Sequence, residues 1–120
     1  MKLYHNTTDN AVDAILTTGF RDTTGKYLTE IEWSGVWFSN YPLGPGEGCK
    51  GNKLLVVELP ISDSELSKYE WVDDASPYRE FLIPAGIINY HGKVWRATEA
   101  DEAEGDEVRD AVFQRILDTL

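Results

Sequence analysis

Two side chains capable of chemistry stand where short apolar segments begin or end. His5 ends the run Lys2–His5, which is long enough for one buried strand, and a helical pattern follows it. A side chain at that point faces whatever lies over the sheet edge, and the unpaired N–H groups of the helix favour an anionic group there. Glu80 heads a second apolar run, Phe81–Ile83.

The segment around His5 predicts a strand followed by a helix. Thr7 and Thr8 offer a hydroxyl for the N-cap, apolar residues follow at helical spacing, and Gly19 is placed to end the helix. The polar residues 21–26 then predict a loop. This arrangement fixes His5 at the carboxyl end of the strand.

The other strands are predicted from β-branched and aromatic residues between turn residues. The clearest is Lys53–Leu59, where four consecutive apolar residues indicate burial on both faces. Ile87–Tyr90 and Lys93–Thr98 are expected to pair as a hairpin around His91 and Gly92. The remaining predicted strands are Gly35–Ser39, Lys68–Val72 and Arg79–Ile83.

Two more helical segments complete the prediction. Ser62 and Glu65 have the spacing of a capping box at a short helical turn. Asp106–Leu120 is expected to be a helix with an acidic first turn and one apolar stripe. The stripe contains Val108, Ala111, Val112, Ile116 and Leu120. Six or seven short strands with an early and a late helix predict an α+β fold, in a single domain spanning residues 1–120.

The composition restricts the classes of partner. The net charge of −10 repels phosphate backbones, so a protein or small-molecule partner is expected in preference to a long nucleic acid. No apolar run reaches the roughly 18 to 20 residues of a membrane helix, so no membrane partner is expected. The single cysteine, Cys49, rules out an internal disulfide and predicts a cytoplasmic location.

Three short motifs, taken in order, resemble the ADP-ribosyltransferase fold in its His-Tyr-Glu branch, which includes poly(ADP-ribose) polymerases and diphtheria toxin. A strand ending in His5, Thr7 two residues later and a short helix closed by Gly-Phe resemble the opening of that branch. The segment Gly35–Ser39 is similar to its Gly-x-Tyr-Phe-Ala/Ser strand, and Glu80 stands where its catalytic glutamate heads an apolar strand. The motifs cover roughly the first two-thirds of the chain. The resemblance implies a split, mostly antiparallel β core with a cleft between its halves.

The resemblance also implies an activity, which is cleavage of NAD at the nicotinamide–ribose bond and transfer of ADP-ribose to an unknown acceptor. NAD would be a substrate, and the mechanism needs no metal. His5 would anchor a ribose, Trp37 would stack on the nicotinamide ring and Glu80 would be the catalytic carboxylate. The NAD-binding set would be His5, Asn6, Thr7, Trp37 and Ser39, with the backbone of Asn6 meeting the nicotinamide amide.

Three positions depart from the family pattern. Asn6 replaces the usual glycine, which permits close approach of the backbone, and Trp37 replaces tyrosine and loses the phenolic hydroxyl. Tyr78 stands where arginine-modifying relatives carry a second Glu or a Gln, so arginine is a less favoured target. Two alternatives therefore stay open. One is an inactive module that binds NAD, ADP-ribose or a protein, and the other is a tRNA 2′-phosphotransferase, which the acidic charge disfavours.

Rival sites are weaker in the sequence. His5, His91 and Cys49 do not have the spacing of a zinc site, and Cys49 has no neighbouring support as a nucleophile. The glycine-rich stretch 44–51 does not have the order of residues of a phosphate-binding P-loop. A pair of glycosidase carboxylates stays open, although no spacing selects a pair among Glu58, Glu65, Glu70 and Glu80.

Overall fold

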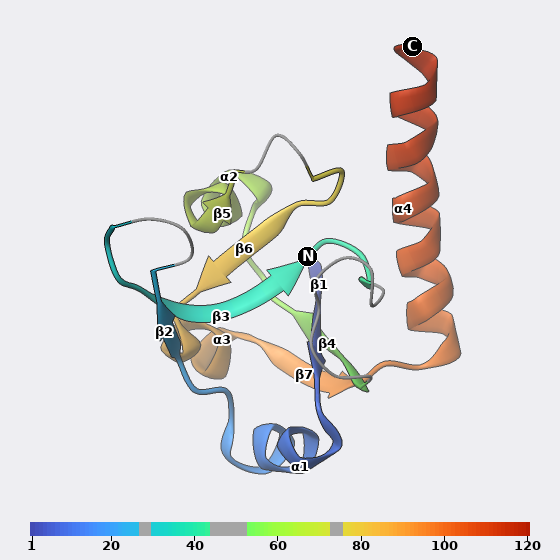
Figure 1. Cartoon of the computed structure of the whole chain (residues 1–120). Helices are drawn as coiled ribbons and strands as arrows, with labels where there is room; N and C mark the ends of the chain where they lie inside the picture. Colours follow the sequence, from blue (N-terminus) through green and yellow to red (C-terminus); the bar gives the residue numbers. More distant parts are fainter. Residues whose placement is uncertain (27–29, 44–52, 73–75) are drawn as a thin grey trace.

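The computed structural model describes residues 1–26, 30–43, 53–72 and 76–120, and it has an α+β fold, as predicted. In these ranges seven antiparallel strands form one sheet in the order β5-β6-β3-β1-β4-β7, with β2 beside β3 (Figure 1). The strands are β1 (Lys2–Thr7), β2 (Thr23–Gly25), β3 (Trp33–Ser39), β4 (Lys53–Glu58), β5 (Glu70–Trp71), β6 (Glu80–Ile83) and β7 (Lys93–Arg96). The helices are α1 (Asp9–Thr18), α2 (Asp63–Leu66), the 3-10 turn η2 (Ser67–Tyr69), α3 (Ala85–His91) and α4 (Glu99–Asp118).

The core lies on the face of the sheet that α1, α2 and α3 cover. Strand register brings alternate apolar residues of four strands to this face, where Val12 of α1, Leu66 of α2 and Ile88 of α3 pack on them. The sheet residues of the core are Leu3, Val36, Phe38, Leu55, Val57, Phe81 and Ile83.

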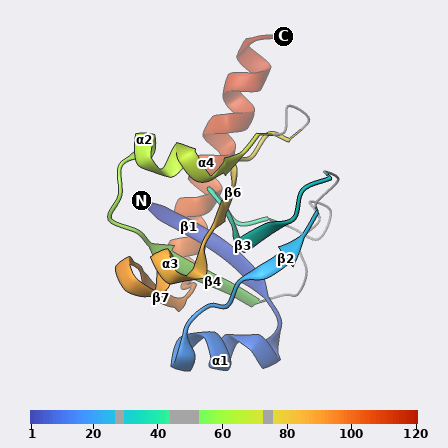
Figure 2. The ribbon, with the colours of Figure 1, turned by 90° about the vertical axis from the view of Figure 1, so that its left-hand side faces the viewer.

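Helix α4 meets the other face and then extends away from the sheet (Figures 1 and 2). Its start is fixed by Asp101, whose Oδ2 accepts hydrogen bonds from the Trp95 indole at 2.8 Å and from the Thr98 backbone at 2.9 Å. The Thr98 side chain accepts in turn from the Asp101 backbone, which completes a capping box. These donors hold the pKa of Asp101 at about 2, below its usual 3.8.

Several sequence predictions are wrong in detail. The expected hairpin at Ile87–Tyr90 is helix α3, because Asp22 accepts a hydrogen bond from the Ala85 backbone and Asn89 binds the Phe20 backbone. The predicted loop 21–26 contains β2, which pairs with β3. Helix α4 begins at Glu99, seven residues before the predicted start.

Other differences are smaller. Strand β1 continues to Thr7, so His5 lies inside the strand and not at its end. Thr8 is the N-cap residue of α1, but its hydroxyl makes no capping hydrogen bond. The predicted strand Lys68–Val72 is a 3-10 turn followed by the two-residue strand β5. Two predictions are confirmed. Gly19, with φ of 89°, follows the end of α1, and Ser62 caps the start of α2.

Candidate functional site

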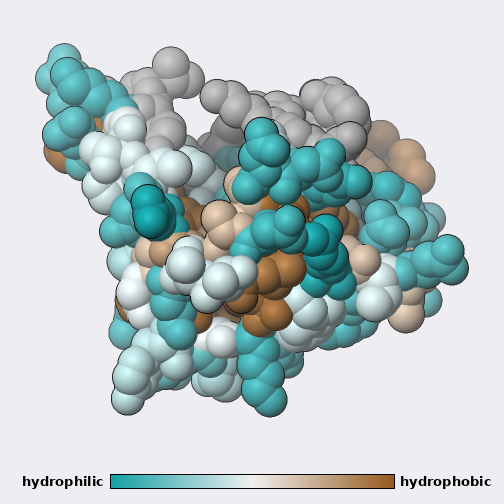
Figure 3. All heavy atoms as spheres, turned by 90° about the horizontal axis from the view of Figure 1, so that it is seen from below, coloured by the Kyte–Doolittle hydropathy of each residue, from teal (hydrophilic) through white to brown (hydrophobic). Residues whose placement is uncertain are grey.

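A pocket of about 890 Å³ opens between β1 and β3, with α1 along one side. The two strands have a single registered pair, Tyr4 with Ser39, whereas β1 pairs with β4 over all six of its residues. Beyond Tyr4 the two halves of the sheet therefore diverge, and the pocket occupies the opening. Its volume is in the range of small-molecule sites in proteins, 300–1,000 Å³. The molecule seen from the α1 side shows an apolar region surrounded by hydrophilic surface (Figure 3).

All six predicted site residues line this pocket, but they come from two faces of the sheet. Tyr4 and Ser39 share a face because they are a registered pair, and alternation puts Asn6 there as well. Trp37 lies on this face because it is two residues before Ser39 on β3, and Glu80 lies there because it is paired with Ser39 across β3 and β6. His5 and Thr7 lie on the opposite face, beside the core, and the divergence of the strands lets both sets reach one cavity.

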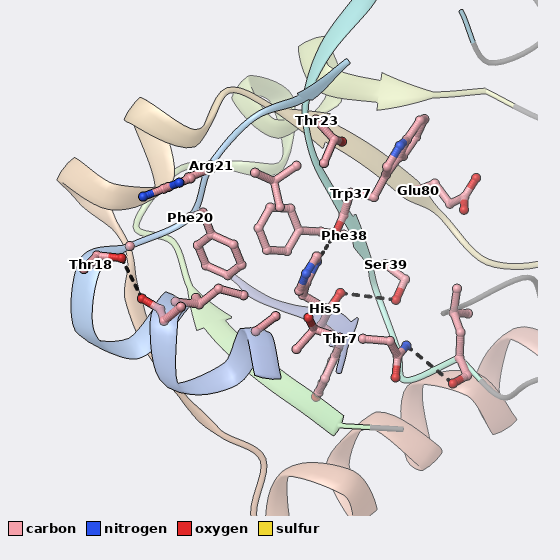
Figure 4. A pocket seen from close by; sticks show the side chains of 18 residues that line it. His5, Thr7, Thr18, Phe20, Arg21, Thr23, Trp37, Phe38, Ser39 and Glu80 are labelled. Carbon is pink, nitrogen blue, oxygen red and sulfur yellow. Dashed lines mark hydrogen bonds between the residues drawn. The ribbon is translucent and has the colours of Figure 1, made fainter. Parts of the chain in front are cut away.

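His5 connects the two halves of the sheet where the backbone ladder stops. Its Nδ1 lies 2.7 Å from the carbonyl oxygen of Trp37 (Figure 4). A carbonyl can only accept, so Nδ1 carries the proton and donates. In the neutral ring Nε2 is then left as a hydrogen-bond acceptor. The ring is held by an edge contact with Phe20, at 5.2 Å between centroids, and by Phe38 at 5.6 Å.

Burial among these rings lowers the pKa of His5 below its ordinary value of 6.5, and the hydrogen bond with Trp37 partly opposes the shift. Above pH 6.5 His5 is neutral in both the folded and the unfolded chain. As the pH falls below 6.5 the unfolded chain takes up the proton first, so the folded state loses stability. The folded state is therefore less stable in mild acid than at neutral pH, as far as His5 contributes.

We expect His5→Gln to weaken the dependence of the unfolding free energy on pH between 7 and 5. The reason is that this variant removes one group that binds protons more tightly in the unfolded chain. Denaturant melts at half-unit pH steps measure the slope. The same histidine-to-glutamine change at His91, which does not line the pocket, is the matched control. An identical slope in wild type and His5→Gln would contradict the assignment.

Glu80, Ser39 and Trp37 form the opposite wall. Glu80 pairs with Ser39 on one side and with Trp71 on the other, so its backbone is held between two strands. Trp37 packs edge-on against Trp71 with 5.4 Å between ring centroids. Ser39 is buried, and its hydroxyl donates to the Tyr41 carbonyl at 2.7 Å. The hydroxyl proton of Ser39 is therefore engaged in a hydrogen bond that stabilises the end of β3.

Asn6 and Thr7 reach the pocket from the last two positions of β1. The Asn6 amide donates to the Leu43 carbonyl at 3.5 Å, a long hydrogen bond that spans from β1 to the segment after β3. Its side chain lines the pocket where the family pattern has glycine. Thr7 is buried at the base of the cavity.

Sequence reasoning missed Arg21, which is the only cationic side chain among the described residues that line the pocket. The segment carrying it is fixed on both sides. Asn89 accepts from the Phe20 N–H at 2.8 Å and donates to the Phe20 carbonyl at 2.9 Å, and Asp22 accepts from Ala85 at 2.8 Å. The sequence offers one signal for Arg21, which is a charged residue directly after the pair Gly19–Phe20 that ends the helix. The position of Arg21 at the cavity, however, depends on these long-range hydrogen bonds.

The positive side chain among the described lining residues of the pocket is Arg21. Residues from the flank of α1 line the cavity, and Asp9 in its first turn forms an ion pair with Lys53 at 3.3 Å. Figure 4 shows Arg21 and Glu80 on opposite sides of the pocket. The cavity is mainly apolar, with a cation at one end and a carboxylate at the other.

Within the described ranges, no three or more His, Cys, Asp or Glu side chains are grouped to hold a metal ion. No helix in the same ranges has the length and apolar character needed to cross a membrane. Cys49 and the glycine-rich stretch 44–51 lie outside the described residues.

Comparison with known proteins gives no significant match: no family model, no curated protein and no solved structure matches this chain.

Proposed function

We propose that the pocket binds NAD and that the protein cleaves its nicotinamide–ribose bond and transfers ADP-ribose to an acceptor. The observation that supports this most is the meeting of His5, Trp37 and Glu80 around one cavity at the opening of the split sheet. Their types and order along the chain resemble the His-Tyr-Glu branch of the ADP-ribosyltransferase fold. The acceptor would be a protein or small molecule.

For this reaction the protein needs to position NAD and to stabilise the positive charge that forms on the ribose. The bond between ribose C1′ and the nicotinamide nitrogen breaks, its electron pair leaves with nicotinamide, and C1′ becomes positively charged. Glu80 would stabilise that charge, and Trp37 would stack on the nicotinamide ring. His5 would accept a hydrogen bond from a ribose hydroxyl through Nε2, because its Nδ1 is occupied by Trp37. The acceptor then bonds to C1′ and gives up its proton.

The polarity of the pocket fits a ligand with charges of both signs. NAD carries a negative pyrophosphate and a positive nicotinamide ring. We propose that the pyrophosphate faces Arg21 and the nicotinamide ring faces Glu80. The bonds from Asn89 and Asp22 hold the Arg21 backbone in place before a ligand arrives, which reduces the ordering cost of binding.

Arg21→Gln is expected to weaken NAD binding about tenfold, because it removes a charge-assisted contact worth roughly 1.5 kcal/mol. Isothermal titration calorimetry at two salt concentrations measures the effect, and the wild-type Kd should rise more with salt than that of the variant. Lys68→Gln is the control, since Lys68 lies on η2 and does not line the pocket. Equal Kd values for wild type and Arg21→Gln would remove Arg21 from the site.

The first test of the function is a titration of NAD into the purified protein, with the thermal midpoint and free nicotinamide measured in the same samples. A ligand that binds only the folded state raises the midpoint. A shift with release of nicotinamide supports an NAD-consuming enzyme. If saturating NAD produces no shift and no nicotinamide, the proposal is wrong.

A binding module on the same fold is the second candidate. Asn6 lines the pocket at the position where the family pattern has glycine, and its side chain would narrow the space for the nicotinamide amide. A thermal shift with ADP-ribose and NAD but no released nicotinamide, in the presence of acceptor proteins, would support this reading.

A further inference from the structure

The second half of α4 and the two residues after it, together residues 108–120, expose an apolar surface that the rest of the described chain does not cover. The helix rises past the sheet, and its C-terminal end lies away from every other labelled element in both views (Figures 1 and 2). Five large apolar side chains here are between 38% and 94% exposed. They are Val108, Phe113, Ile116, Leu117 and Leu120.

The first half of the same helix is firmly attached. Tyr4 donates to the Asp101 carbonyl at 3.3 Å, and Lys2 forms an ion pair with Glu104 at 2.7 Å. Gly105 is buried against the ring of Pro42, where an added Cβ would lie within 2.8 Å of the Pro42 Cγ. The exposed half is therefore a fixed extension of an anchored helix. A short helix has little stability of its own in water, so a covering partner would stabilise this half.

Charge is distributed unevenly along α4. Residues 99–107 carry six acidic side chains and no basic one, whereas residues 108–120 carry two of each sign, Arg109, Asp110, Arg115 and Asp118. The exposed half is thus neutral on a molecule with a net charge of −10. Two copies can meet there without bringing the strongly acidic residues 99–107 of each copy into contact.

We propose that residues 108–120 of α4 pack against the same residues of a second copy, with the two helices antiparallel. A parallel pair would place the two acidic halves side by side, while an antiparallel pair points them in opposite directions. The same patch then serves both subunits, as two-fold symmetry requires. The partner of this surface is thus another copy of the chain.

The exposed area is sufficient for such a dimer. Five large apolar side chains with about half of each exposed amount to roughly 1,000 Å² over two copies, which is near the lower limit for a specific interface. The dimer should therefore be moderately weak and depend on concentration. None of residues 108–120 lines the pocket, so a variant in this half of α4 can lose dimerisation while it still binds NAD.

Sedimentation equilibrium of the full chain over 1–200 μM tests the association. We expect wild type to shift from monomer to dimer within this range, and Phe113→Glu with Leu117→Glu to remain monomeric. Gln114→Glu adds charge on the opposite side of the helix and should still dimerise. Wild type that stays monomeric at 200 μM would overturn the proposal, and so would monomers that bind vesicles of zwitterionic lipid through this helix. Dimerisation that the double variant leaves unchanged would overturn it as well.

Spin labels decide the orientation. A spin label is attached to Glu102→Cys in a Cys49→Ser background. If the two helices are antiparallel and cross at residue 114, each label lies 12 residues from the crossing point. A rise of 1.5 Å per residue then gives a distance of roughly 36 Å between the two labels. Parallel helices would place the labels within about 15 Å of each other, since packed helix axes lie 8–10 Å apart. The short distance would refute the antiparallel arrangement.

Discussion

Glu80→Gln is expected to lower NAD turnover about 100- to 1,000-fold while raising the NAD Kd by only about two- to fivefold. The substitution keeps the size of the side chain but removes the negative charge and replaces one acceptor oxygen by an N–H donor. Because the positive charge moves from the nicotinamide ring to the ribose only on the way to the transition state, loss of the carboxylate should reduce turnover much more than ground-state binding. Nicotinamide release measured beside calorimetric binding separates the two effects.

Glu107→Gln is the matched control for this experiment. Glu107 is exposed on α4, does not line the pocket and undergoes the same chemical change. It should retain wild-type turnover. If Glu80→Gln retained turnover in a preparation that binds NAD, the carboxylate would have no part in the reaction and the mechanism would be wrong.

Asp101→Ala should lower the free energy of unfolding by about 3 kcal/mol, because it leaves the Trp95 indole and the Thr98 backbone without their acceptor. For a chain of this length the thermal midpoint should fall by roughly 10 °C. Calorimetric melts at pH 7 measure the change. Glu102→Ala, one residue later in the same turn, is exposed and should change the midpoint by no more than a few degrees.

The Asp101 effect should disappear in acid. The pKa of Asp101 is about 2 in the folded state and 3.8 in its absence, so its contribution is complete above pH 3.8 and lost as the pH falls toward 2. Melts at pH 7, 4 and 2.5 should show wild type and Asp101→Ala converging. A constant difference across this range would mean that the charge of Asp101 does not contribute to stability.

The fold class follows from the sequence because local patterns and tertiary packing agree in most of the strands. The four apolar residues of β4 predict burial on both faces, and Leu55, Val56 and Val57 are fully buried. The α+β fold with a helix after the first strand and a helix at the C-terminal end is confirmed. The start of α4 was also encoded locally, in the Thr98–Asp101 spacing, but the acidic run after it obscured the apolar periodicity.

Helix α3 could not be predicted because its determinants are distant in sequence. The pair Ile87–Ile88 favours a strand by local preference. The Asp22 and Asn89 side chains override it by binding backbone groups of Ala85 and Phe20, more than sixty residues apart. The same bonds place Arg21 at the pocket, so the error in the fold and the omission from the site have one cause.

The candidate site was only partly predictable for a similar reason. Sequence order suggested His5, Trp37 and Glu80, and the structure brings them to one cavity. The divergence of β1 from β3 after a single registered pair is not visible in the sequence. Without it, alternation would place His5 and Trp37 on opposite faces with no shared space. The roles of these residues in NAD chemistry stay a prediction.

The link between His5 and position 37 is made to a backbone carbonyl, and this affects how the site can change by mutation. Any residue at position 37 supplies the same backbone carbonyl, so the hydrogen bond that connects the two halves of the sheet does not depend on the Trp37 side chain. A replacement of tyrosine by tryptophan can therefore alter the surface offered to a ligand without disturbing the neighbouring strand. The shape of the opening and the side chain presented at position 37 are therefore set by separate parts of the same residue, its backbone and its ring.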